Sequence, residues 1–279
     1  MCKYLYINVL LILFLVNKTG FAQVPENQLK FADSLFKAQN YFDAITEYKR
    51  LLFFDGNNEY DFSANYKIAL AYKFGAKYGS AINYFRIASN YAKLPEQKFN
   101  IELMIVRTNI LRGTENVALQ MLDDLMKQAG TVSKKKEIYY WRGWAYMFKD
   151  DWENASKSFA QINPNHKLKL LCDKVNDEKY SVTFAKVISY ILPGFGQFYT
   201  GHYLSGLLSL GWNVLWGYTT VNAFASDRIF DGLVIANLLW FRFYRGNFQN
   251  AEKFAKQENL KITNKALYKI QTEYRGLKP

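Results

Sequence analysis

The spacing of hydrophobic residues divides the chain into four parts. An apolar run, Leu5–Val16, broken only by Asn8, lies near the start. Residues 24–180 show helical spacing of apolar positions, and three longer apolar segments follow between residues 181 and 241. Residues 246–279 return to helical spacing with interspersed lysines. Because apolar positions three or four residues apart indicate helices, this pattern predicts an all-α protein.

A regular series of small residues organises residues 24–180. Alanine recurs at intervals of 37 residues, at Ala44, Ala81, Ala118 and Ala155. A large apolar residue follows each alanine by four positions, at Tyr48, Phe85, Leu122 and Phe159. Small residues let antiparallel helices approach closely, and one helical hairpin cannot bury its own apolar face. The register therefore predicts four stacked hairpins, with turns at Gly75, Gly113 and 149–151.

Residues 38–58, AQNYFDAITEYKRLLFFDGNN, resemble the second helix and closing turn of the tetratricopeptide repeat family. The chain departs from that family in its longer period, in Gly56 where proline is usual, and in Asn109 and Glu115 where aromatic residues are usual. The resemblance implies a helical-hairpin solenoid whose concave surface, lined by the first helix of each pair, binds a protein or peptide. The groove residues that it implies are Leu29, Asp33, Phe36, Lys37, Tyr66, Lys73, Phe74, Arg107, Tyr140, Trp144 and Phe148.

The mixture of aromatic and basic residues in this groove suits an extended peptide that carries carboxylates. The alternative is that several of the aromatic residues pack between neighbouring repeats.

Three apolar segments, Ser181–Tyr199, Tyr203–Phe224 and Ile229–Phe241, predict a short transmembrane helical domain over residues 181–245. The second segment has 22 residues without a charge, which as a helix reaches about 33 Å, enough for a bilayer core of about 30 Å. Four-residue spacing of small and polar residues predicts helix packing within the membrane, or between copies of the chain, through Ser205, Ser209, Asn213 and Gly217.

A break is expected in the first of these segments, because Pro193 lacks a backbone donor and the adjacent glycines permit unusual backbone shapes. The stretch resembles the Pro-Gly-x-Gly-Gln-x-Tyr signature of small bacterial membrane domains, mostly of unassigned function. The matching residues are Pro193, Gly194, Gly196, Gln197, Tyr199 and Gly201. We interpret Gln197 as a structural cap rather than a substrate ligand.

The two ends of the chain predict its location. Residues 1–22 have the charge, apolar run and small residues of a secretory signal peptide, with cleavage expected after Ala22, although an uncleaved anchor is the alternative. Residues 246–279 are expected to form a basic amphipathic helix, at the membrane surface or packed as an ordinary tail. Together these features predict a protein of the bacterial inner membrane, with its repeats on the periplasmic side and three membrane crossings.

Composition narrows the choice of function. The chain has 36 Lys and Arg against 24 Asp and Glu, and only two His and two Cys. So few potential ligands exclude a zinc cluster or a disulfide framework, no cofactor is expected, and the carboxylates form no ordered acid–base group. Basic residues gather beside the most apolar part of the chain, so anionic lipid is a better partner than nucleic acid.

The sequence thus favours a non-enzymatic, membrane-anchored scaffold of the cell envelope that binds a protein or peptide through its repeats. The alternative is a subunit of a membrane transport or channel assembly. That alternative requires a polar path along the apolar segments, for which the candidates are Gln197, Asn213, Asn222, Asp231 and Asn237.

Overall fold

The computed structural model describes residues 25–279, which are helical without strands. The expected signal peptide, residues 1–22, lies outside the described residues. Two compact units divide at Lys149–Asp150, inside the turn expected between the two helices of the fourth hairpin. The separation of repeats from membrane segments at residue 180 stays a prediction.

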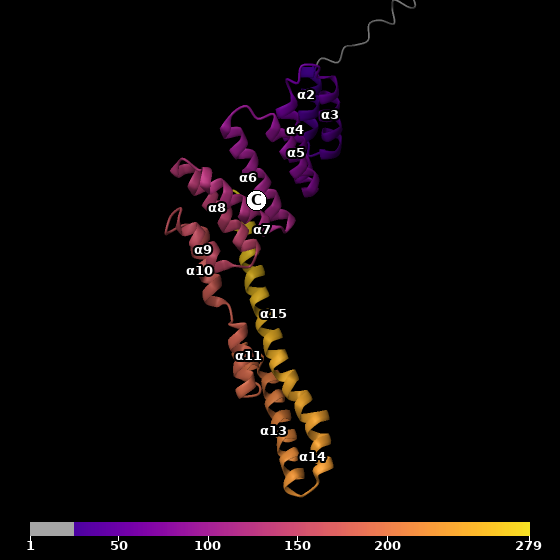
Figure 1. The fold of residues 1–279 in the computed structure, drawn as a ribbon, viewed down its shortest axis with the longest axis vertical. Coiled ribbons are helices and arrows are strands. Elements are labelled where there is room, and N and C mark those ends of the chain that lie inside the picture. The colour runs from indigo at the N-terminus through magenta and orange to yellow at the C-terminus, as the bar shows by residue number, and fades with distance from the viewer. Residues whose placement is uncertain (1–24) are drawn as a thin grey trace, which may run out of the picture. The chain divides into compact units, whose positions relative to one another are not determined.

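The first unit is a run of helices in which each packs on the next (Figure 1). Its helices are α2 (Pro25–Lys37), α3 (Tyr41–Phe54), α4 (Asp61–Phe74), α5 (Tyr78–Asn90), α6 (Pro95–Arg112), α7 (Glu115–Gln128) and α8 (Val132–Phe148). The register alanines Ala44, Ala81 and Ala118 are fully buried, with Tyr48, Phe85 and Leu122 beside them. This arrangement is compatible with a tetratricopeptide-like fold.

The helices of the first unit end where the sequence predicts. Gly75 follows α4, and Gly113 follows α6 with a left-handed backbone, φ 78°. A glycine adopts this conformation without steric cost, and its N–H closes the last helical turn. At the other end of α6, Pro95 occupies the first turn, where its missing N–H costs nothing.

The second unit begins with the helix pair α9 (Trp152–Ala160) and α10 (Lys167–Glu178). It continues through α11 (Val182–Ile191), the single turn α12 (Phe195–Tyr199), α13 (Tyr203–Ala225) and α14 (Ile229–Ile235), then a π-helical turn η1 (Ala236–Trp240) and α15 (Phe241–Glu273). Figure 1 shows α13 and α14 as a hairpin, and α15 returns along α13 and α11 to α10.

The third apolar segment does not end before the tail. Helix α15 runs for 33 residues, about 50 Å, so the expected tail helix is a continuation of the third segment. Gly246 does not interrupt it, since a glycine inside a helix costs only about 1 kcal/mol relative to alanine. Ring stacking of Phe243 on Trp212 and of Phe248 on Tyr190 holds the helix on both sides of that glycine.

The predicted membrane crossings are not confirmed. Among residues 25–279, no helix has both the length and the apolar character that crossing a membrane requires. Helix α11 has only 10 residues, because the chain breaks near Pro193, and α14 has 7. Helix α13 has 23 residues, but serine, threonine, asparagine and glycine positions lower its mean hydropathy.

Candidate functional site

The predicted groove residues all lie in the first unit, on the helices that the resemblance implies. Helix α2 carries Leu29, Asp33, Phe36 and Lys37, α4 carries Tyr66, Lys73 and Phe74, α6 carries Arg107, and α8 carries Tyr140, Trp144 and Phe148. They separate into two groups with different surroundings.

The aromatic residues near the start of the unit pack between helices. Phe36 lies 5.6 Å from Tyr41 and 6.0 Å from Phe74, measured between ring centroids. Phe74 still has 56% of its surface exposed, and Lys37 is exposed. Asp33 is paired with Lys67 and accepts a hydrogen bond from Tyr48. For Phe36 and Phe74, packing between neighbouring helices therefore accounts for much of their contact.

The second group includes two cations, Lys73 and Arg107. We name these two residues, with Tyr66 and Trp141, the basic cluster. The guanidinium carbon of Arg107 lies 4.4 Å from the ring centroid of Trp141, a cation–π contact. The charge of Arg107 acts on both Lys73 and Tyr66. Three helices, α4, α6 and α8, thus bring their side chains to one place.

Lys73 is the unusual member of the basic cluster. Only 6% of the residue is exposed, and within residues 25–279 its ammonium group makes no hydrogen bond or ion pair. Burial, together with the neighbouring charge of Arg107, lowers the pKa of Lys73 to about 8. The side chain is therefore still mostly protonated at neutral pH.

A buried cation without a counter-ion has an unfavourable free energy, which a bound anion reduces. Burial also lowers the pKa of Arg107, and the charges of Tyr66, Glu137 and Tyr140 oppose that shift. The basic cluster is therefore suited to binding a carboxylate or another anion.

Trp141 was missed by the sequence analysis. The repeat register aligns Arg107 with Trp144, which lies 37 positions later, whereas the guanidinium rests on Trp141, almost one helical turn earlier. Trp144 is only 2% exposed and makes an edge-to-face contact with Tyr140. The pattern of residue types contains no signal that would choose between these two tryptophans.

The Pro-Gly signature of the second unit is organised by Asn247 from α15. Its side-chain oxygen accepts hydrogen bonds from Gly194 N–H at 2.8 Å, Ser209 Oγ at 2.9 Å and Gln197 Nε2 at 3.2 Å. Its Nδ2 donates to the carbonyl of Ser189, and Gln197 Nε2 also donates to the Asn247 carbonyl at 2.9 Å. We name Ser189, Gly194, Gln197, Ser209 and Asn247 the Asn247 cluster.

This cluster gives the signature residues a structural part. Gln197 is fully buried and ties the break between α11 and α12 to α15. A Cβ on Gly194 would overlap the carbonyl oxygen of Gly206, and one on Gly196 would overlap that of Ala185. Tyr199 Oη accepts a hydrogen bond from Ser181 N–H at 3.1 Å, while Gly201 has φ 81° at the turn into α13. Asn247 was missed because it lies about 50 residues from its partners.

The residues predicted for helix packing make contacts within the chain. Ser209 binds Asn247, as described above, and Asn213 is 95% buried with Nδ2 donating to the Ser209 carbonyl at 2.8 Å. A Cβ on Gly217 would lie 3.4 Å from the indole of Trp240. Ser205 is half-buried. Through these residues α13 packs on α15 and η1, in addition to its contacts with α14 and α12.

Large apolar side chains are exposed on α11–α14, on η1 and at the start of α15. We name the following exposed residues the apolar belt: Phe184, Val187, Tyr190, Ile191, Leu192, Phe195, Tyr199, Tyr203, Leu204, Leu207, Leu208, Trp212, Val214, Leu215, Tyr218, Val221, Phe224, Ile229, Phe230, Leu233, Val234, Leu238 and Phe241. In contrast, Ser189, Gln197, Asn213, Thr220 and Asn247 are buried. Large apolar side chains thus face outward in this part of the chain and several uncharged polar groups lie inside, while Asn222, Arg228, Asp231 and Asn237 are also exposed.

The five candidates for a polar transport path do not come together. Gln197 and Asn213 lie in the interior near Ser209, while Asn222 and Asn237 are exposed. Asp231 is exposed at the hairpin turn, where its carboxylate lies 3.7 Å from Arg228. The arrangement therefore lacks a continuous polar line through these residues.

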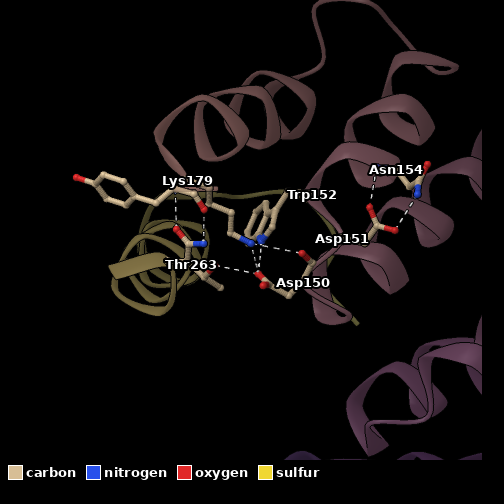
Figure 2. Close-up of polar contacts among 8 residues, drawn as sticks. Asp150, Asp151, Trp152, Asn154, Lys179 and Thr263 are labelled. Carbon is tan, nitrogen blue, oxygen red and sulfur yellow. Dashed lines mark hydrogen bonds and ion pairs between the residues drawn. The ribbon is translucent and has the colours of Figure 1, made fainter. Parts of the chain in front are cut away.

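A further polar group joins the first helices of the second unit to α15. Figure 2 shows the carboxylate of Asp150 accepting hydrogen bonds from Trp152 Nε1 and Lys179 Nζ, both at 2.7 Å, and from Thr263 Oγ1 at 2.9 Å. Burial raises the pKa of Asp150, but these hydrogen bonds outweigh it and the pKa is lowered. The next residue, Asp151, caps α9 by accepting from Asn154 N–H at 3.1 Å.

No known protein family matches this sequence, and no curated protein is significantly similar to it. Among the described residues, no group of three His, Cys, Asp or Glu side chains could hold a metal ion. The functional argument therefore rests on the basic cluster and on the apolar belt.

Proposed function

We propose that this chain is a membrane-anchored, non-enzymatic scaffold of the bacterial cell envelope. Its second unit inserts the apolar belt into lipid, and its first unit binds an acidic peptide segment of a partner protein at the basic cluster. Following the apolar run in residues 1–22, we propose that it lies at the inner membrane with the repeats on the periplasmic side.

The inverted distribution of polarity in the second unit is the observation that carries this proposal. Monomeric soluble proteins rarely expose large apolar patches. In lipid, by contrast, apolar side chains face outward, and small and polar residues form the contacts between helices. The belt residues and the buried Asn213, Gln197 and Asn247 follow that second arrangement.

The mean hydropathy of a whole helix does not describe the surface that meets lipid. In α13 the residues that reduce hydropathy include Asn213, Gly217 and Thr220, and all three are buried. The exposed positions of the same helix include Leu207, Val214 and Val221. Lipid insertion of the α13–α14 hairpin is therefore compatible with its polar content.

The basic cluster suggests what the scaffold binds. A peptide carboxylate placed beside Lys73 and Arg107 would form charge-assisted hydrogen bonds with both cations. The cluster therefore favours an acidic segment of the partner.

A single flotation experiment tests both halves of the proposal. Full-length chain is mixed with phosphatidylethanolamine–phosphatidylglycerol vesicles and a fluorescent acidic peptide, chosen from an array in which each peptide has a Gln/Asn counterpart. We expect the wild type to carry the peptide into the floating layer. Lys73→Met should float without peptide, and Lys98→Met, which changes an exposed lysine on α6 outside the predicted groove, should behave as wild type.

Two outcomes would contradict the proposal separately. A wild-type chain that stays at the bottom of the gradient would contradict anchoring by the belt. Equal peptide capture by the wild type and Lys73→Met, or equal capture of acidic and Gln/Asn peptides, would contradict the binding function of the basic cluster. Replacing Leu207 and Val221 with Glu should abolish flotation but leave peptide binding in solution unchanged.

A further inference from the structure

A cavity of about 500 Å³ lies between α13 and α15 in the second unit. Its lining includes four large apolar side chains, those of Leu204, Leu208, Trp212 and Phe243. Leu204 and Leu208 also belong to the apolar belt, so the cavity adjoins the surface that we propose to lie in lipid.

The polar part of the lining carries a single formal charge. Arg242 is the only charged residue among those that line it, and it makes no hydrogen bond or ion pair with any residue in 25–279. Ser205 and Asn250 add a hydroxyl and an amide to the same lining. Asn213 also lines it and is 95% buried, with an Oδ1 atom that has no hydrogen-bond partner in the described chain.

These groups define the chemistry of a ligand. A guanidinium presents donors in a planar fork that matches two oxygens of a phosphate. In lipid, an arginine without a counter-ion has an unfavourable free energy, which an anion beside it reduces. The apolar residues of the lining are suited to hydrocarbon, and Asn213 Oδ1 needs a donor such as a headgroup hydroxyl. The fitting ligand therefore has an anionic oxygen group and a hydroxyl attached to acyl chains.

We infer that this cavity binds one membrane phospholipid, with the phosphodiester at Arg242, the rest of the headgroup towards Asn250, and an acyl chain against Leu204, Leu208 and Trp212. The inference rests on the proposed lipid insertion of the second unit. It adds a defined lipid site to what would otherwise be non-specific contact with the bilayer.

Native mass spectrometry of the full chain in detergent tests the site by titration with dioleoylphosphatidylglycerol. We expect one saturable lipid adduct for the wild type. Arg242→Gln should weaken its affinity about tenfold, the size expected for loss of a charge-assisted hydrogen bond. Arg245→Gln is the matched control, because Arg245 is exposed on the same helix but does not line the cavity.

Ligand controls separate the parts of the lipid. Dioleoylglycerol has the same chains without phosphate, and glycerophosphoglycerol has the phosphodiester without chains; neither should form the saturable adduct. If Arg242→Gln unfolds, Asn250→Leu provides a second variant, which should weaken the affinity by a smaller factor.

The inference is overturned if Arg242→Gln and Arg245→Gln bind the lipid equally, or if the wild type forms no saturable adduct. Tight binding of glycerophosphoglycerol or inorganic phosphate would instead identify a soluble phosphate site and also overturn it. Flotation distinguishes this failure from that of the proposed function: Arg242→Gln should still float with vesicles, since the belt is unchanged.

Discussion

Lys73 and Arg107, one from α4 and one from α6, place two like charges beside each other in the repeat unit, and the charge of Arg107 helps to lower the pKa of Lys73. No carboxylate within residues 25–279 pairs with Lys73, which is 94% buried. The pair therefore destabilises the unliganded fold and favours a bound anion. Removing the Lys73 charge should therefore raise the stability of the unliganded protein and lower its affinity for an anion.

Replacing Lys73 with Met should stabilise the unliganded protein while removing peptide binding. Methionine fills similar volume without a buried charge, so the free energy of unfolding should rise by about 1–3 kcal/mol. Urea denaturation of the wild type and Lys73→Met measures the change, with Lys37→Met as the exposed control. A loss of stability in Lys73→Met would mean that the ammonium has a structural partner, and would argue against an anion site.

The titration of Lys73 predicts the pH dependence of binding. Since its pKa is lowered to about 8, affinity for an acidic peptide should be highest below pH 8 and fall as the pH rises above it. Fluorescence anisotropy of the labelled peptide between pH 6 and 10 measures this. The same affinity at pH 7 and pH 9.5 would show that the ammonium does not contact the peptide.

The unliganded protein should show the opposite trend. Between pH 8 and the ordinary lysine value of 10.5, the unfolded chain holds a proton that the folded chain has released, so the free energy of unfolding rises with pH. Subtracting the profile of Lys73→Met isolates this contribution from other titrating groups. A flat difference would contradict the lowered pKa.

Asn247 should be essential to the second unit. Asn247→Ala leaves Gly194 N–H and the Gln197 amide without their side-chain acceptor in a buried site, which should cost about 2–4 kcal/mol. Amide hydrogen exchange of Phe195–Tyr199 in detergent should accelerate accordingly. Asn264→Ala, an exposed change on the same helix, should leave that exchange unchanged; similar exchange in both variants would show that the Asn247 cluster is not what holds α12.

Close backbone approach predicts different outcomes for two glycines. Gly196→Ala introduces a methyl group that overlaps the carbonyl of Ala185 and lies 2.6 Å from Cβ of Ala251, so the melting temperature should fall. Gly211→Ala, on α13, meets no atom within 4 Å and should stabilise its helix by about 0.5–1 kcal/mol. Thermal melting in detergent compares the two, and a neutral Gly196→Ala would contradict the packing of α12 on α11.

The features that could be predicted from sequence are those encoded by local spacing. The alanine register predicts the helix pairs, and Ala44, Ala81, Ala118 and Ala155 are all fully buried. Gly75 and Gly113 end their helices as expected, and the chain breaks at Pro193. These successes share a cause, since helical periodicity and turn residues act over a few positions.

The features that could not be predicted depend on distant partners. Asn247 reads as one polar residue of a basic tail, because its hydrogen-bond partners are about 50 residues away along the chain. The continuous helix through Gly246 is favoured by Trp212 and Tyr190, which lie on other helices. Nor does the spacing reveal that Arg107 rests on Trp141 rather than Trp144.

The central claim is that lipid surrounds the apolar belt, and spin labelling tests it most directly. Spin labels are placed at Val221, which is 62% exposed in the belt, and at Leu260, which is 60% exposed on α15 outside it. Both labels are introduced singly, after Cys2 and Cys172 have been replaced, in chain bound to phosphatidylethanolamine–phosphatidylglycerol vesicles. We predict that the Val221 label collides more with oxygen than with a water-soluble nickel complex, and the Leu260 label the reverse. A Val221 label as accessible to the nickel complex as the Leu260 label would contradict lipid insertion of the belt.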